Sequence, residues 1–317
     1  MVKNTTALAV NIFLLLICIC QMLANLFVLI AFIKNRNLRR NDNLILLVSL
    51  AFIDLMYAIL SVPYLIILII YWVPDGNAFN YSAPLIIGFG GLPAALMKSG
   101  CTITTLIAID RIVALFFPMK YYTLQRRRYL IGGFILSMLM AAFDWAMLFM
   151  VSSIEPSPGC SSFACFTSGT FRAYWGLSNT IVNMISCLLT IGVVFGLRRL
   201  RWGRSKRVAQ ERRQLDDKAA NRAAVLIITV SAVFGVVPGI INACGEFLNL
   251  EIFNEIGFFI GVCASISGLS HAFIFGMAHR GMRMHILEMF GFKVADQTRI
   301  SSVRSMAQQQ SVFQKVR

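Results

Sequence analysis

Charged residues are scarce in this chain: only 14% of its 317 residues are Asp, Glu, Lys or Arg, whereas 58% are hydrophobic. The mean hydropathy is +0.73. A soluble domain carries about 25% charged residues, and a water-exposed surface cannot be built from far fewer. The composition therefore excludes a soluble globular protein and predicts an all-α membrane protein, in which long apolar runs hold the hydrophobic residues.

Residues and motifs that carry catalysis are scarce as well. Histidine occurs three times, always at position 271 or later, and no zinc, haem or Walker spacing is present. The glycines at 88–91 lie inside an apolar run and follow no strand, which excludes a phosphate loop. The last apolar run, 256–278, has no lysine that could hold retinal. We therefore expect no enzyme, no metal site and no cofactor.

Seven apolar runs are long enough to cross a bilayer as helices, because a span needs about 20 mostly apolar residues. They cover about 7–33, 44–72, 83–109, 129–151, 173–197, 223–248 and 256–278. The sequence predicts a seven-transmembrane helix bundle formed by one domain, 1–290. A Ser- and Gln-rich tail, 291–317, is predicted to be disordered.

Basic residues gather in alternate loops. Twenty-five of the 29 Lys and Arg lie after the first, third, fifth and seventh runs, and only Lys3 and Arg172 lie in the other loops. Because basic loops stay in the cytoplasm, this asymmetry predicts the N-terminus outside and the tail in the cytoplasm. Topology and attraction to anionic lipid explain the net charge of +15, so no nucleic-acid partner is needed.

The outer loops carry two kinds of candidate modification site. Cys160 and Cys165 are the only two of the eight cysteines in a polar loop, and a disulfide between them is expected if that loop is extracellular. Asn4 and Asn80 begin glycosylation sequons. Both lie close to a helix end, where the glycosylation machinery reaches poorly.

Ionisable side chains inside apolar runs are costly, so each is a candidate functional position. Asp54 is either an interior switch or a structural hydrogen-bonding hub with Asn25. Lys98 and Asp144 lie at comparable depth in the predicted outer half. They either form an internal salt bridge, or Lys98 receives an acidic ligand.

Two further residues near the predicted outer ends are candidates for a ligand pocket. Trp175 either belongs to the interfacial aromatic belt or lines the pocket. Glu246 either lies in a solvated loop or favours a cationic ligand.

The end of the third run carries a recognisable motif. Asp110-Arg111 is followed by Ala114, Pro118 and Tyr121. This stretch resembles the Asp-Arg-Tyr…Ala…Pro…Tyr signature of rhodopsin-like G-protein-coupled receptors. The resemblance implies that the residues of this chain that contact the G protein are Asp110, Arg111, Pro118 and Tyr121.

Other positions extend the resemblance over 7–290. Leu50-Ala51-x-x-Asp54 is similar to the second-helix motif, and His271 to Phe275 occupy the slot of Asn-Pro-x-x-Tyr. Met282-Arg283 resembles the start of a short amphipathic helix 8, about 280–290. By the same resemblance, the positions of an activation switch are Asn25, Asp54, Pro238, His271 and Phe275.

Departures from the family pattern narrow the resemblance. Val236 stands where the sixth helix has its Trp, and Ile86 replaces the outer cysteine of the third helix, so the family's usual disulfide cannot form there. With His271-Ala272 in place of Asn-Pro, the chain resembles the nematode serpentine chemoreceptors, class BC or a neighbouring class.

The resemblance implies a plasma-membrane receptor, in a sensory cilium or elsewhere, that binds a small-molecule ligand and activates a heterotrimeric G protein. The short N-terminus and small outer loops favour a volatile or pheromone-like ligand over a peptide. The alternatives are a peptide or amine neuromodulator receptor, a seven-helix transporter or channel, and a receptor-like scaffold that no longer signals. The ligand and the oligomeric state are not predicted.

Overall fold

The computed structural model describes residues 2–74, 80–123, 126–160, 162–203, 223–235, 237–239, 253–278, 280–289 and 291. Within these ranges the regular structure is helical and contains no strand. Six helices are long and apolar enough to cross a membrane. They are α1 (Val2–Lys34), α3 (Ile45–Ile70), α4 (Ala83–Phe116), α6 (Arg126–Val151), α7 (Gly169–Gly203) and α9 (Phe253–Ala278). The predicted all-α membrane fold is confirmed.

The sixth run of the sequence is described as a shorter apolar helix over Ala223–Gly239, which we call the 223–239 helix. Val236 within it and the rest of the predicted run, 240–248, lie outside the described residues. The predicted tail also lies outside them, apart from Gly291.

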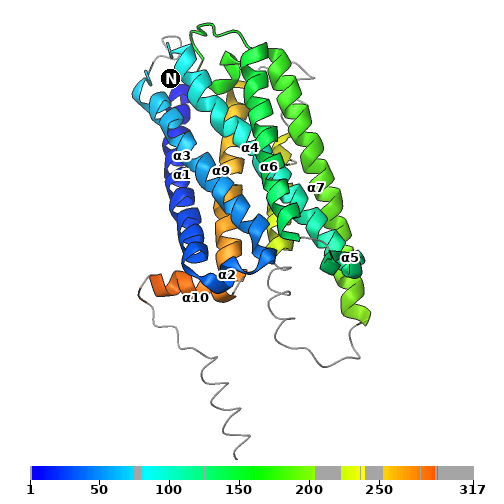
Figure 1. The fold of residues 1–317 in the computed structure, drawn as a ribbon. Coiled ribbons are helices and arrows are strands. Elements are labelled where there is room, and N and C mark those ends of the chain that lie inside the picture. Colours follow the sequence, from blue (N-terminus) through cyan, green and yellow to red (C-terminus); the bar gives the residue numbers. More distant parts are fainter. Residues whose placement is uncertain are drawn as a thin grey trace, which may run out of the picture.

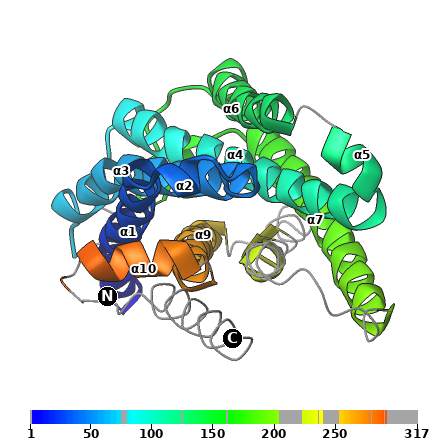
Figure 2. The ribbon, with the colours of Figure 1, turned by 60° about the horizontal axis from the view of Figure 1, so that its bottom comes forward.

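The long helices stand side by side in one bundle (Figure 1). Helix α1 packs against α3 and α9, while α4 contacts α3, α6 and α7. Three short helices lie at one end, which we call the α10 end: α2 (Arg36–Arg39), α5 (Pro118–Thr123) and α10 (Arg280–Met289). Helix α10 lies across the ends of α1 and α9 (Figure 2). The opposite end, called the η3 end, holds the 3-10 helix η3 (Phe163–Phe166).

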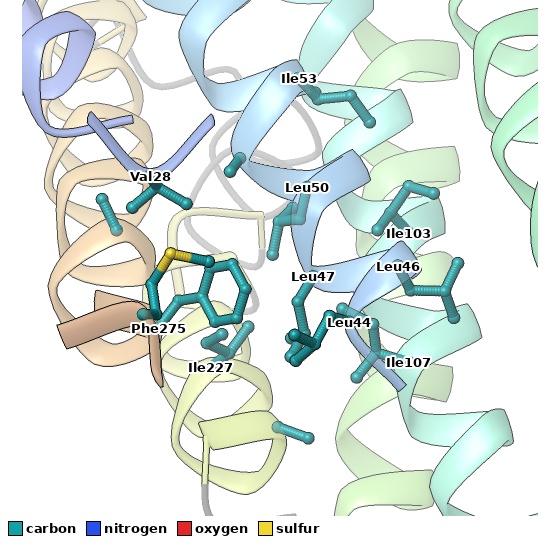
Figure 3. Packing of buried hydrophobic residues seen from close by; sticks show 14 of the residues in the cluster. Val28, Leu44, Leu46, Leu47, Leu50, Ile53, Ile103, Ile107, Ile227 and Phe275 are labelled. Atoms are coloured by element: carbon teal, nitrogen blue, oxygen red, sulfur yellow. The ribbon is translucent and has the colours of Figure 1, made fainter. Parts of the chain in front are cut away.

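Apolar side chains fill the bundle near the α10 end (Figure 3). Leu50 and Ile53 of α3 belong to the same buried cluster as Ile107 of α4, Ile227 of the 223–239 helix and Phe275 of α9. Other large apolar side chains, among them Leu16, Leu139 and Leu188, are exposed on the outside of the bundle. An exposed apolar exterior around a packed interior is the arrangement that a lipid environment requires.

Two helix ends have local causes. Helix α4 runs to Phe116, beyond the predicted end at 109, and the residue after it, Phe117, leaves the helical conformation with φ −127° and ψ 56°. Pro118 follows directly, and a proline disfavours the helical conformation in the residue before it. Helix α10 ends before Gly291, whose φ of +79° favours glycine. Within α10, Met282 is buried and Arg283 is exposed, so the helix is amphipathic.

Candidate functional site

A cavity of about 140 Å³ lies between α1, α3, α4, α7, α9 and η3 at the η3 end, and we call it the η3 cavity. Its wall is mainly apolar and aromatic. The larger lining side chains include Leu14, Tyr64, Met97, Phe163, Trp175 and Ile260. A concave, mostly apolar space with a few polar groups is typical of a small-molecule site.

Phe163 of η3 lies directly against the backbone of α4. A Cβ added at Gly90 would lie 2.6 Å from Cδ2 of Phe163 and 3.3 Å from Cε2 of Tyr64. The Phe163 N–H donates a hydrogen bond to the Tyr64 hydroxyl at 3.0 Å. Glycine at position 90 is therefore what allows this aromatic side chain to close the cavity.

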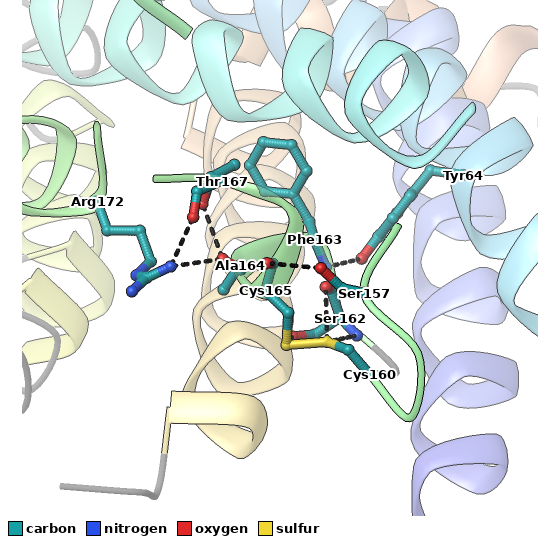
Figure 4. The surroundings of a disulfide bond; sticks show 9 residues. All are labelled: Tyr64, Ser157, Cys160, Ser162, Phe163, Ala164, Cys165, Thr167 and Arg172. Atoms are coloured by element: carbon teal, nitrogen blue, oxygen red, sulfur yellow. Dashed lines mark hydrogen bonds between the residues drawn. A yellow bond between two sulfur atoms is a disulfide. The ribbon is translucent and has the colours of Figure 1, made fainter. Parts of the chain in front are cut away.

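The loop that carries η3 is held in place by covalent and polar links (Figure 4). A disulfide joins Cys160 and Cys165. Arg172 of α7 donates through Nη1 to the carbonyl oxygens of Ala164, at 2.9 Å, and Thr167, at 2.7 Å. These links fix η3 as a cap over the cavity.

Lys98 and Asp144 meet inside the bundle, away from the η3 cavity. Lys98 Nζ lies 3.8 Å from Asp144 Oδ2, and both side chains are 1% exposed. Lys98 also donates to Ser178 Oγ at 2.7 Å, and the Tyr174 hydroxyl donates to Asp144 Oδ1 at 2.7 Å. Neither Lys98 nor Asp144 lines the cavity. This is the geometry of the internal salt bridge, one of the two alternatives left open by the sequence.

A second buried polar network surrounds Asp54 in the middle of the bundle. His271 of α9 places Nδ1 2.9 Å from Asp54 Oδ2 and Nε2 2.8 Å from Ser231 Oγ of the 223–239 helix. From α1, Gln21 Nε2 donates to the Asp54 carbonyl at 2.9 Å, and Asn25 Nδ2 donates to the Gln21 carbonyl at 3.0 Å. The network therefore joins four helices, and Asn25 reaches Asp54 through Gln21.

The Asp-Arg motif lies at the α10 end. Arg111 Nη2 is 2.6 Å from Asp110 Oδ2, and the two residues are 6% and 4% exposed. The Tyr121 hydroxyl lies 3.5 Å from Asp110 Oδ2, and Pro118 begins α5 beside them. Ala224 of the 223–239 helix lines the same small crevice as Asp110 and Arg111. All four predicted coupling residues therefore lie near one another.

The remaining predicted site residues are scattered. Trp175 lines the η3 cavity and donates Nε1–H to the Ala94 carbonyl at 3.1 Å, and Pro238 is buried in the 223–239 helix. Asn80 is exposed just before α4. Glu246 and the side chain of Asn4 lie outside the described residues.

Tyr81, within the Asn80 sequon, is buried. Its hydroxyl donates to the Leu68 carbonyl at 3.1 Å, and burial raises the pKa of this phenol to about 12. The second sequon is therefore anchored to the end of α3 by its middle residue.

Comparison with known families agrees with this arrangement. The family described as "Serpentine type 7TM GPCR chemoreceptor Srbc" matches residues 3–274. This is most of the chain, and it includes the long helices apart from Val2 of α1 and the last turn of α9. The chain belongs to this family. The family is one of GPCR-type chemosensory receptors and not of enzymes, so the protein is a multi-pass membrane receptor. Among curated proteins, none matches the chain.

Several residues at the receptor's η3 cavity were not found from the sequence. Asn11, Tyr64 and Phe163 line it, and Arg172 lines it while holding the η3 loop. The ligand-pocket residues predicted from the sequence were Lys98 and Asp144 within the spans, and Trp175 and Glu246 near the outer ends. Asn11 is a polar residue near the start of the first apolar run, and this signal was present in the sequence.

Proposed function

We propose that this receptor binds a small external ligand in the η3 cavity and activates a heterotrimeric G protein at the α10 end. In this orientation the N-terminus lies outside, and the basic loops and the tail, 291–317, lie in the cytoplasm. The charge asymmetry of the loops supports the orientation. Membership of a chemoreceptor family favours a receptor over a transporter or channel.

The observation that carries the proposal is the order of three features along the bundle. The cavity lies at the η3 end, and the buried pair Asp110–Arg111 lies at the α10 end. The network of Asp54, His271 and Ser231 lies between them and contacts both α9 and the 223–239 helix. The packed helices therefore connect the ligand cavity at the η3 end to Arg111 at the α10 end, so that a bound ligand can change the packing at the α10 end.

Activation follows from differential affinity. A ligand that binds the open bundle better than the closed bundle shifts the population towards the open state. In the open state the 223–239 helix, carrying Pro238, moves away at its α10 end, so that Ala224 leaves the crevice beside Arg111. The ion pair between Arg111 and Asp110 then opens, and Arg111 contacts the G protein.

The 223–239 helix packs closely against α7. Gly235 and Gly239 face Asn183 and Thr180 of α7, and a Cβ at either glycine would lie within 3 Å of those side chains. Small residues spaced four apart allow such close helix contacts in membranes. The glycines therefore allow the helix to pack closely against α7, and the hydrogen bond between Ser231 and His271 connects it to α9.

The test is G-protein recruitment in cells that express the full chain at the plasma membrane, during a screen of volatile and other small molecules. We expect ligand-dependent recruitment that is lost in Arg111→Ala and kept in Arg39→Ala, an exposed arginine at the same end. Surface expression of all three proteins is measured in parallel. Recruitment by Arg111→Ala equal to that of the wild type would contradict the proposal.

A further inference from the structure

The volume of the η3 cavity limits the size of its ligand. The cavity measures about 140 Å³. An apolar protein cavity of about 150 Å³ is large enough for benzene. The volume of the η3 cavity therefore matches a molecule of roughly one aromatic ring with a short substituent.

Most polar groups in the wall already have partners within the protein. Tyr64 accepts from the Phe163 N–H, Trp175 donates to the Ala94 carbonyl, and Ser61 donates to the Tyr57 carbonyl at 2.7 Å. These groups bring aromatic and hydroxyl surface to the cavity without needing a ligand.

Asn11 of α1 differs from them. It lines the cavity and is 2% exposed, and its Oδ1 has no hydrogen-bond partner among the described residues. An unpaired buried amide oxygen is costly, because it has lost its water without gaining a partner. A ligand that offers a hydrogen bond at this point removes that cost.

The charges around the cavity restrict the ligand further. Arg172 is the one charged side chain among the described lining residues, and none of them is a carboxylate. A cationic ligand would therefore be buried without a counter-charge. The Nη1 of Arg172 donates to two loop carbonyls, so part of this guanidinium is already used in holding η3.

We propose that the η3 cavity binds a small, neutral, mainly apolar alcohol or phenol. Its hydroxyl bonds the Asn11 amide, and its ring or chain lies against Tyr64, Phe163 and Trp175. The hydroxyl both donates and accepts, so it pairs with either orientation of the amide. The inference rests on the proposed function only in taking this cavity as the ligand site.

The test measures direct binding to the purified full-length receptor in lipid nanodiscs, by thermal shift and by ligand-observed NMR. The probes share one ring: benzyl alcohol, toluene, benzylamine and benzoate. We expect benzyl alcohol to bind about tenfold more tightly than toluene, the difference that one good hydrogen bond makes. Benzylamine and benzoate are expected to bind more weakly than benzyl alcohol.

Asn11→Leu keeps the size of the side chain and removes the amide. In this variant we expect the affinity for benzyl alcohol to fall about tenfold, and toluene to bind at least as tightly as it does to the wild type. The preference for benzyl alcohol over toluene is then removed or reversed. Asn179→Leu is the matched control, because Asn179 is a buried asparagine whose amide atoms also lack partners and it does not line the cavity. That variant is expected to keep the wild-type ranking.

Every outcome of this test either supports or overturns the inference. Tighter binding of benzylamine or benzoate, equal binding of alcohol and toluene, or no probe binding that depends on residue 11 would overturn the inference. If Asn11→Leu does not fold, the wild-type ranking of the four probes decides alone. Binding with the expected ranking but without G-protein recruitment would support the inference and contradict the proposed function.

Discussion

Replacing Lys98 by Met tests whether the buried pair in the bundle is structural. Lys98 Nζ and Asp144 Oδ2 are 3.8 Å apart and both side chains are 1% exposed. At an effective dielectric constant of 20, opposite charges at this distance attract by about 4 kcal/mol. Removing one partner of a buried pair costs about 3–5 kcal/mol, because the other charge remains buried and uncompensated. We expect Lys98→Met to lower the free energy of unfolding by about this amount.

The assay is equilibrium unfolding of the purified receptor in a double-mutant cycle with Lys98→Met, Asp144→Leu and the double variant. We expect the double variant to regain most of the stability that either single variant loses, since replacing both charges by apolar groups is often neutral. Lys120→Met, at an exposed lysine, is the control and should change stability by less than about 0.5 kcal/mol.

Two results would refute this reasoning. Lys98→Met could be as stable as the wild type, or the double variant could lose the sum of the two single losses. Either result would mean that Lys98 and Asp144 do not stabilise one another. The ligand alternative for Lys98 would then regain support.

Three further predictions concern residues that shape the interior. Gly90→Ala should displace Phe163, cost about 1–3 kcal/mol in stability and weaken benzyl alcohol binding in nanodiscs. Gly268→Ala should push Gln21 away from the Asp54 network and cost a similar amount, measured by thermal unfolding. Cys160→Ser opens the short loop disulfide and should cost about 2 kcal/mol, with weaker benzyl alcohol binding because the cap over the cavity loosens.

One control serves both glycine variants. Nothing lies within 4 Å of a Cβ added at Gly88, so Gly88→Ala should leave stability and probe binding unchanged or slightly improved. A glycine variant that is as stable as Gly88→Ala would contradict the prediction for that glycine. Unchanged probe binding after reduction of the wild-type disulfide would contradict the prediction for Cys160→Ser.

The fold was largely predictable because a bilayer imposes a simple rule on sequence. A run of about 20 apolar residues must be a helix in lipid, and hydropathy finds such runs directly. Helix ends were harder to place. Asp110 and Arg111 look like the aqueous end of α4 in the sequence, but they pair with one another, are buried, and lie within a helix that continues to Phe116.

The site was predictable only in part. The cost of burying charge drew attention to Asp54, Lys98 and Asp144, and the structure places all three inside the bundle. The same rule could not tell which interior polar residue faces a cavity, because that depends on how neighbouring helices are rotated. Asn11, which faces the cavity, is uncharged, and so the rule did not select it.

The most direct test of the account is the side of the membrane on which the basic ends of the helices lie. Intact cells that express the full chain with an N-terminal epitope are treated with external protease, and the same cells are treated after permeabilisation. We expect the epitope to be removed from intact cells, and the basic segment 198–222 to be cut only after permeabilisation. Cleavage of that segment in intact, sealed cells would contradict the orientation and with it the proposed G-protein face.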